Sequence, residues 1–179
     1  MLELTIPARE FFNEETGEFM ITKQTVLALE HSLISLSKWE SKWKKPFISR
    51  EPKTIEESID YVRCMTVGKV DPLVYLAIDA EALSSINAYI DDPMTATTFS
   101  SRSDKKGKQE KITAEILYYQ MTALNIPFEC EKWHLNRLLT LIHVCALKNQ
   151  PPKKMSKKAL ANHYTALNEA RRQRLGTRG

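Results

Sequence analysis

The sequence predicts an α+β protein that is mainly α-helical, with a small N-terminal β-hairpin or sheet packed on a helical domain and a basic C-terminal helix. Three observations lead to this prediction. Apolar and polar residues alternate at the N-terminus, which is typical of a half-buried strand. From Ser32 onward, apolar residues recur every three or four positions, as they do on one face of a helix. From Lys148 onward, the chain is strongly basic.

Length and composition narrow the class of protein. The 179 residues suit one main domain with appendages. Hydrophobic residues make up 42% of the chain and charged residues 27%, a balance that supports a folded core. No apolar run approaches the ~20 residues of a membrane span, and the N-terminus lacks a signal-peptide pattern. Three cysteines without a C-x-x-C pair disfavour a secreted disulfide framework. We therefore expect a soluble cytosolic protein with no membrane partner.

We divide the chain into three segments. Residues 1–30 form a β element, 31–148 a helical core domain, and 149–179 a basic C-terminal arm. The charge divides at nearly the same place: nine cations and one acid give 148–179 a net charge of +8, whereas 17 cations and 21 acids give the rest −4. A basic arm on a mildly acidic body indicates an acidic binding partner, which can be protein, nucleic acid or the body itself.

The N-terminal segment is expected to be a hairpin or a three-stranded sheet. Alternation predicts a strand at 2–6, and further strand-forming residues stand at 19–21 and 26–29. Residues 13–17 offer a turn, in which Gly17 can take a positive φ. So small a sheet is only marginally stable alone, so we expect it to lie on helices.

A first helix is predicted from Ser32 until Pro46 ends it. Its apolar positions have helical spacing and share one face. They are Leu29, Leu33, Leu36, Trp39 and Trp43. Thr54 and Glu57 have the spacing of a capping box, in which each side chain accepts a backbone N–H from the other residue, so a second helix begins there. Its inward residues are expected to be Ile55, Ile59 and Val62.

Two further helices precede a long break in the pattern. Asp71 and Pro72 supply an N-cap and a first-turn proline, which predicts a short helix. Another helix continues the apolar spacing as far as Asp91. The polar residues 92–111 then predict a mobile loop, and long loops in compact domains are usually functional or disordered.

The helix after this loop is apolar on two sides, so we expect it to be central. Its two sides carry Ile112, Ile116, Tyr119 and Ala123, and Leu117, Met121 and Leu124. The next helix carries a single stripe of Leu135, Leu138, Leu139, Ile142 and Cys145. An extended Pro-Pro spacer at 150–153 then leads to a basic helix capped by Ser156. The apolar residues of that basic helix are Leu160, Tyr164, Leu167 and Ala170.

No constellation of residues predicts catalysis or a cofactor. Cys130 and His134 have ligand spacing, with His143 and Cys145 further along the same expected helix. His134 and Cys145 would lie about 16 Å apart, so they cannot share one ion. We therefore expect small buried cysteines, a locally hydrogen-bonded His134, no metal and no cofactor. A nucleophile elbow and a phosphate loop are both missing, and we expect no enzyme activity.

Three regions are candidate partner-binding surfaces. The first is the face that carries Trp39 and Trp43, which helical spacing assigns to a core or a partner rather than to a stacking platform for single strands. The second is Phe99 with the 94–108 loop. The third is the arm, through Lys153, Lys154, Lys157, Lys158, Arg171, Arg172 and Arg174. Only Tyr164 interleaves with these cations, which favours a solvated or protein-docking helix over a nucleic-acid-binding one.

Three blocks of sequence go beyond generic composition. They are residues 29–47 (LEHSLISLSKWESKWKKPF), residues 92–99 (DPMTATTF), and residues 124–142 (LNIPFECEKWHLNRLLTLI) running into 149–158 (NQPPKKMSKK). Together they resemble a family of small proteins of long-tailed bacteriophages, the tail assembly chaperones. The resemblance spans nearly the whole chain and includes no catalytic motif.

The resemblance implies a non-enzymatic role in the cytoplasm of the host cell. A tail assembly chaperone holds the tape measure protein soluble while tail tube subunits polymerise around it. The implied partners are the tape measure protein, the tail tube protein and further copies of the chain. Two alternatives stay open: a structural virion component, such as a connector or tail-completion protein, and a nucleic-acid-binding module that uses the arm.

Overall fold

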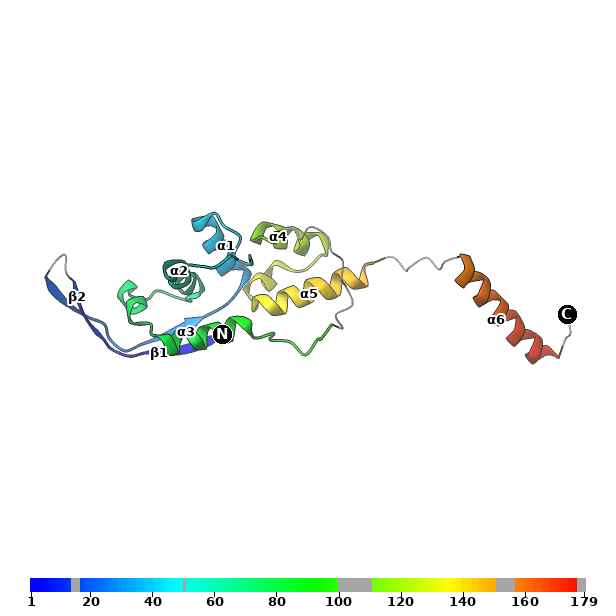
Figure 1. Cartoon of the computed structure of the whole chain (residues 1–179), viewed down its shortest axis with the longest axis horizontal. Helices are drawn as coiled ribbons and strands as arrows, with labels where there is room; N and C mark the ends of the chain where they lie inside the picture. Colours follow the sequence, from blue (N-terminus) through cyan, green and yellow to red (C-terminus); the bar gives the residue numbers. More distant parts are fainter. Residues whose placement is uncertain (14–16, 50, 100–110, 151–156, 177–179) are drawn as a thin grey trace. The chain divides into compact units, whose positions relative to one another are not determined.

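The computed structural model describes residues 1–13, 17–49, 51–99, 111–150 and 157–176. The protein is mainly α-helical with a small N-terminal antiparallel β region, which confirms the predicted fold class (Figure 1). Two compact units make up the chain, Met1–Ala146 and Leu147–Gly179. Among the described residues, no helix has the length and apolar character needed to cross a membrane.

The N-terminal residues form a hairpin of two paired segments, not a three-stranded sheet. β1 (Leu2–Ile6) pairs antiparallel with β4 (Thr25–Leu29), and β2 (Glu10–Asn13) pairs antiparallel with β3 (Glu18–Ile21). Gly17 has φ +68°, as the predicted turn requires.

A buried threonine joins the two segments of the hairpin. The backbone N–H of Thr22 donates to the carbonyl of Arg9 over 2.8 Å, and the N–H of Arg9 donates to Thr22 Oγ1 over 2.9 Å. Pro7, which has no N–H to contribute to a ladder, follows the last residue of β1. The ribbon therefore continues past the proline through a side-chain contact.

A first core cluster lies under the β1–β4 pair. Apart from Trp39, its other buried side chains come from α2 (Ile55–Met65), the 3₁₀ helix η1 (Pro72–Ala77) and α3 (Ala80–Asp91). Thr54 and Glu57 form the predicted capping box at the start of α2. The expectation for Ile55 is wrong, because this first residue of α2 is 82% exposed.

A second core cluster gathers the C-terminal helices of the Met1–Ala146 unit. It contains buried residues of α4 (Ala114–Ala123), of the 3₁₀ helix η2 (Phe128–Lys132) and of α5 (Leu135–Lys148). The buried side of α4 carries Leu117 and Met121. Tyr119, on its other side, is 72% exposed, so the expectation of a central α4 is wrong.

The helix shared by both clusters is α1 (Leu33–Trp43). Leu33 and Leu36 belong to the second cluster, and Trp39 belongs to the first. Ser32 caps the helix, and Leu29, expected on the same helical stripe, lies instead in β4. α1 therefore holds the central position that the sequence assigned to α4.

A buried carboxylate links α1 to the start of α4. Glu40 accepts the backbone N–H of Phe47 and that of Ala114, each over 2.7 Å. Thr113 precedes α4 but makes no side-chain capping bond. The Glu40 carboxylate takes over that role, since a negative charge is favourable at a helix N-terminus.

Candidate partner-binding surfaces

The two tryptophans of α1 lie against α2. Trp39 is 1% exposed, and its indole N–H donates to the carbonyl of Glu57 over 2.8 Å. Trp43 is partly buried and donates its indole N–H to Asp60 over 2.8 Å. Trp39 therefore belongs to the core and is removed from the candidate partner-binding surfaces, because its ring and its polar atom are both occupied.

Ion pairs stabilise this α1–α2 contact. Lys42 binds Asp60, and Lys45 binds Glu57 over 2.6 Å. The hydrogen bond from Lys45, followed by that from the Thr54 N–H, lowers the pKa of the Glu57 carboxyl. Charge-assisted bonds to well-covered carboxylates favour a fixed contact over an exchangeable one.

Two histidines lie inside the molecule where the core clusters meet. The His31 and His134 rings have centroids 5.0 Å apart, and His31 Nδ1 lies 2.6 Å from the hydroxyl of Tyr61. Burial, and then the nearby His134, lower the pKa of His31 to about 3. His134 Nε2 donates to the carbonyl of Tyr89 over 3.0 Å, whereas its buried Nδ1 has no hydrogen-bond partner among the residues that the structure describes.

Among the described residues, these histidines do not belong to a cluster that could hold a metal ion. Cys130 lies in η2 and not in the helix of His143 and Cys145, so the expectation of one helix for these residues is wrong. Cys130 is buried, in keeping with its expected role as a small hydrophobe. Within the described part of the chain, no three His, Cys, Asp or Glu side chains are placed to hold an ion.

The three blocks quoted for the family resemblance meet at this place. The backbone N–H of Leu135 donates to the carbonyl of His31 over 2.7 Å. The Asn136 amide donates to the carbonyls of Ile90 and Asp92, each over 2.8 Å. Segment 124–142 is therefore hydrogen-bonded both to 29–47 and to 92–99, although the three are distant in sequence.

Phe99 packs against α5. Its ring lies edge-on to that of His143, with centroids 4.2 Å apart, and the side chain is partly exposed. Residues 92–99 contain neither helix nor strand, in keeping with the expected loop. Residues 100–110 of that loop lie outside the described residues. Phe99 keeps an accessible edge for a partner.

A groove between α2 and α3 is a further apolar surface. It has a volume of about 440 Å³, and the Lys53 ammonium at its wall lies 4.4 Å from the centroid of the Phe47 ring. Burial lowers the pKa of Lys53, and the nearby Glu57 opposes that shift. The apolar lining comes from Phe47, Ile55, Tyr61, Val62, Leu83, Ile86 and Ile90. Sequence spacing predicted inward residues on α2 but did not show a gap beside them.

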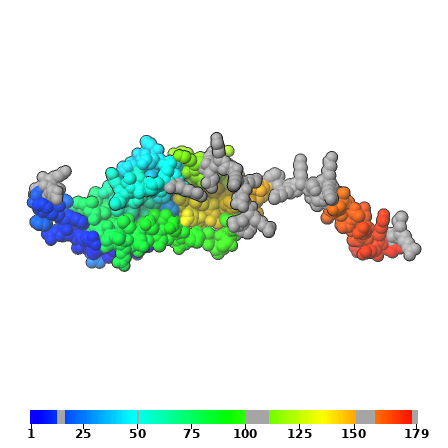
Figure 2. Space-filling view, in the orientation of Figure 1, coloured from blue at the N-terminus to red at the C-terminus, as the bar shows by residue number. Residues whose placement is uncertain are grey.

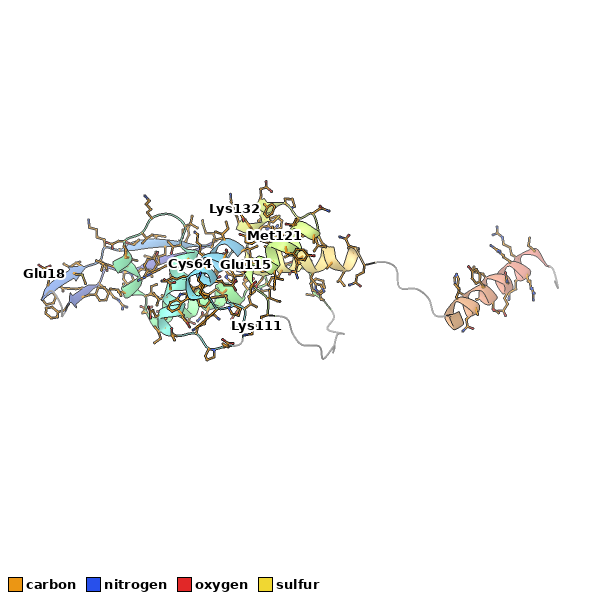
Figure 3. All side chains as sticks on the ribbon, turned by 90° about the horizontal axis from the view of Figure 1, so that it is seen from above. Glu18, Cys64, Lys111, Glu115, Met121 and Lys132 are labelled. Atoms are coloured by element: carbon orange, nitrogen blue, oxygen red, sulfur yellow. The ribbon has the colours of Figure 1, made fainter. Side chains whose placement is uncertain are left out.

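The arm forms α6 (Lys157–Leu175), and every residue from 160 to 176 is exposed. Leu160, Tyr164 and Leu167 have exposed fractions of 40%, 57% and 40%. Spacings of four and three place these side chains on one face, and Arg171 and Arg174 continue that face. We call these five residues the arm face; side chains project from α6 on all sides in Figure 3.

The other predicted cations of the arm are less fully described. Arg172 lies on α6 and is exposed. Lys157 and Lys158 belong to α6, but their side chains lie outside the described residues, as do Lys153 and Lys154 altogether. The described part of the arm therefore joins two of the predicted arginines with an apolar stripe on one surface.

An apolar face of the hairpin escaped the sequence prediction. Phe12, Phe19 and Ile21 are 56%, 67% and 70% exposed, and the two phenyl rings have centroids 5.1 Å apart. The signal was the consecutive pair Phe11 and Phe12, because neighbours in a strand point to opposite faces. Figure 2 shows the hairpin as a narrow blue projection at one end of the Met1–Ala146 unit.

Comparison of the chain with family models, with curated proteins and with solved structures gives no match. The candidate surfaces therefore depend on geometry: the arm face, the exposed side of the hairpin, the α2–α3 groove and the edge of Phe99. The first three combine apolar side chains with nearby charge, and Phe99 offers an aromatic edge, which is the chemistry of protein contacts.

Proposed function

We propose that this protein is a non-enzymatic tail assembly chaperone of a long-tailed bacteriophage. It binds the tape measure protein in the cytoplasm of the host cell and helps tail tube subunits to polymerise around it. The observation that carries the proposal is the arm face, an apolar and cationic stripe exposed along a 19-residue helix. Such a helix gains stability when a partner covers its apolar side.

The resemblance of the three blocks supplies the class of partner. The hydrogen bonds from 124–142 to 29–47 and to 92–99 support treating the blocks as one structural unit rather than as three chance similarities. A tape measure protein is long and largely helical, so an amphipathic helix is a suitable surface to pack against it. The α2–α3 groove offers the same client a second apolar contact.

The energetics suit a chaperone that leaves before the virion matures. Full burial of an exposed apolar side chain contributes about 1.5–3 kcal/mol, and Leu160, Tyr164 and Leu167 have 40%, 57% and 40% of their surface left to cover, so each contributes roughly half of that. Association costs about 4–15 kcal/mol in lost motion. The gain does not exceed this cost by much, so the arm face alone gives weak binding that can be reversed. Arg171 and Arg174 add electrostatic steering toward an acidic client.

Co-expression with the tape measure and tail tube proteins tests the proposal. The intact chain is expected to raise the soluble yield of the tape measure protein severalfold. Leu160→Ser, Tyr164→Ser and Leu167→Ser in one chain should remove that gain. Asn162→Ser, Ala166→Ser and Gln173→Ser, on the opposite face of α6, form the matched control and should retain it. Equal yields with and without the protein would refute the chaperone function.

Mass spectrometry of purified virions separates this proposal from the structural alternative. A chaperone is absent from mature particles, whereas a connector or tail-completion protein is present at a fixed copy number. Recovery of the tape measure protein by a tagged chain from infected cells, together with absence from virions, is the expected result. A fixed copy number in virions would instead assign the protein to the virion.

The charge of the arm favours one further candidate, a nucleic-acid-binding module. Residues 148–179 carry a net charge of +8, and three arginines lie close together at 171–174. Such a module would bind phosphates, so the logarithm of its affinity would fall linearly with the logarithm of the salt concentration. The triple serine variant distinguishes the two functions, because it removes apolar contacts and leaves the charges that would bind DNA.

A further inference from the structure

We propose that the α2–α3 groove binds a helical segment of a partner protein, and that this segment presents apolar side chains with a carboxylate beside them. The carboxylate is received by Lys53, at the wall of the groove. The chemistry of the segment follows from the groove alone. Its assignment to the tape measure protein rests on the proposed function.

The groove is large enough and apolar enough to take side chains from another molecule. Its volume of about 440 Å³ compares with about 30 Å³ for one water molecule in the liquid, and it falls within the range of about 300–1,000 Å³ that is usual for ligand sites. Tyr61 and Ile86 contribute walls that belong to the first core cluster. Apolar side chains that enter the groove therefore leave water for an apolar surrounding, which favours binding.

The apolar surface extends out of the groove, which favours a polypeptide over a small ligand. Ile55 lines the groove, yet 82% of its surface is exposed. A small molecule held inside the groove would leave most of Ile55 in water. A helix lying along the groove can cover Ile55 with one side chain and fill the groove with the next, as amphipathic helices do when they bind in grooves.

Lys53 gives the groove its charge preference. The ion pairs among the described residues do not include Lys53. Glu57 acts on it only at a distance, since one carboxylate oxygen accepts from Lys45 over 2.6 Å and the other accepts the Thr54 N–H over 2.9 Å. Burial lowers the pKa of Lys53, which shows that its ammonium has lost water. A carboxylate from a partner would replace that water with a charge-assisted hydrogen bond.

Asp91 limits where that carboxylate can lie. Asp91 also lines the groove, is exposed, and forms no ion pair with Lys53 or with any other described residue. It repels an acid that approaches its own side of the groove, whereas Lys53 attracts one. The partner's acid is therefore expected beside Lys53, with a neutral or basic residue facing Asp91.

The rest of this chain is a poor match for the groove. The segments outside the described residues contain one large apolar side chain apart from prolines, that of Met155, which follows two lysines. The apolar side chains of α6 are accompanied by Arg171 and Arg174, not by acids. A basic segment would place its cations near Lys53, where like charges repel. The groove therefore fits a different protein, and the arm face selects the same apolar and acidic chemistry.

Fluorescence anisotropy of labelled peptides with the purified full chain tests the inference. The probe is an alanine-based helix of about 16 residues with leucines at i, i+4 and i+7 and a glutamate at i+3. Two further peptides carry glutamine or lysine in place of the glutamate. The glutamate peptide is expected to bind about tenfold more tightly than the glutamine peptide, and the lysine peptide more weakly still.

Reversing the charge of the groove should reverse this order. Lys53→Glu is expected to bind the lysine peptide more tightly than the glutamate peptide. Lys69→Glu is the matched control, because it gives the same net charge at an exposed position that does not line the groove, and it should keep the original order. Circular dichroism confirms that each variant is folded before its binding is compared.

Two further variants locate the binding. Asn87 is exposed and lines the groove, so Asn87→Trp can fill the groove from its rim and should weaken all three peptides at least about tenfold. The chain with Leu160→Ser, Tyr164→Ser and Leu167→Ser should keep the preference for glutamate, because its groove is intact.

Four results would overturn the inference. They are equal binding of the three peptides, an unchanged order in Lys53→Glu, and a preference for glutamate that is lost only in the triple serine variant. The fourth is tighter binding of sodium decanoate than of the glutamate peptide, which would assign the groove to a fatty acid. If the peptides fail but co-expression still raises the yield of the tape measure protein, the proposed function stands. If the peptides bind as expected but co-expression fails, the groove serves another partner.

Discussion

α1 and α6 carry the same kind of apolar stripe and use it in opposite ways. Leu33, Leu36 and Trp39 of α1 lie buried between two core clusters. Leu160 and Leu167 of α6 recur at similar spacing and remain exposed. Spacing therefore shows that a helix has an apolar side, but the elements available to cover that side decide whether it becomes core or binding surface.

The largest expected effect on stability comes from shortening a buried side chain of α1. Leu36 is fully buried, so Leu36→Ala should lower the free energy of unfolding by about 2–5 kcal/mol. Urea unfolding followed by tryptophan fluorescence measures the change, because Trp39 and Trp43 lie on the same helix. A loss below about 1 kcal/mol would contradict the shared position of α1 between the two clusters.

Removing the carboxylate that joins α1 to α4 should cost less. Glu40→Gln keeps the size of the side chain but loses the charge that accepts two backbone N–H groups. The expected loss in the free energy of unfolding is about 1–3 kcal/mol. Glu115→Gln, at an exposed site in the first turn of α4, is the matched control and should change stability by less than about 0.5 kcal/mol.

A fall in pH should destabilise the core around α1 before it affects the arm. Burial lowers the pKa of His31 to about 3 in the folded state, whereas an unfolded histidine titrates near 6.5. The unfolded chain takes up the proton first, so this stability is present above pH 6.5 and lost as pH falls toward 3. The slope is at most about 1.4 kcal/mol per pH unit for one proton.

Thermal unfolding between pH 7 and 5 measures this slope with little contribution from carboxylates. His31→Gln should flatten it, because the side chain no longer takes up a proton on unfolding. His143→Gln, at an exposed position, should leave it unchanged. An equal slope in the intact chain and in the His31 variant would contradict the assignment.

The smallest effect is expected on the arm. Leu167→Ala should change the free energy of unfolding of the monomer by less than about 0.5 kcal/mol, because the exposed side chain gives up little packing. The same urea titration as for Leu36→Ala, at a concentration of about 1 μM, makes the comparison direct. A loss of 2 kcal/mol would show that the arm face is already covered within one chain.

Local signals in the sequence predicted much of the fold because their physics is local. The turn at Gly17 needs a positive φ, and the capping box of Thr54 and Glu57 needs only neighbouring atoms. Position within the fold was predicted less well. Tyr119 shares a helical face with other apolar residues, yet the contacts of α4 with α1 use the side of Leu117.

The same difference between local signals and position in the fold applies to the candidate surfaces. Charge alone identified the arm, and helical spacing identified its apolar stripe. Trp39 was placed on a face that could be core or partner-binding surface, because spacing cannot reveal that α2 covers it. The exposed side of the hairpin was missed because no strand was predicted at Phe11 and Phe12, and which of the two packs inward depends on the core beneath them.

The bond between Glu40 and Ala114 also bears on how the chain folds during synthesis. It joins residues 74 positions apart, so the second core cluster cannot close until α4 has been made. At about 5–20 residues per second, a ribosome needs roughly 4–15 s for that stretch. Leu33 and Leu36 stay uncovered for that time. During synthesis the chain thus exposes the apolar side of α1 before the segment that covers it exists.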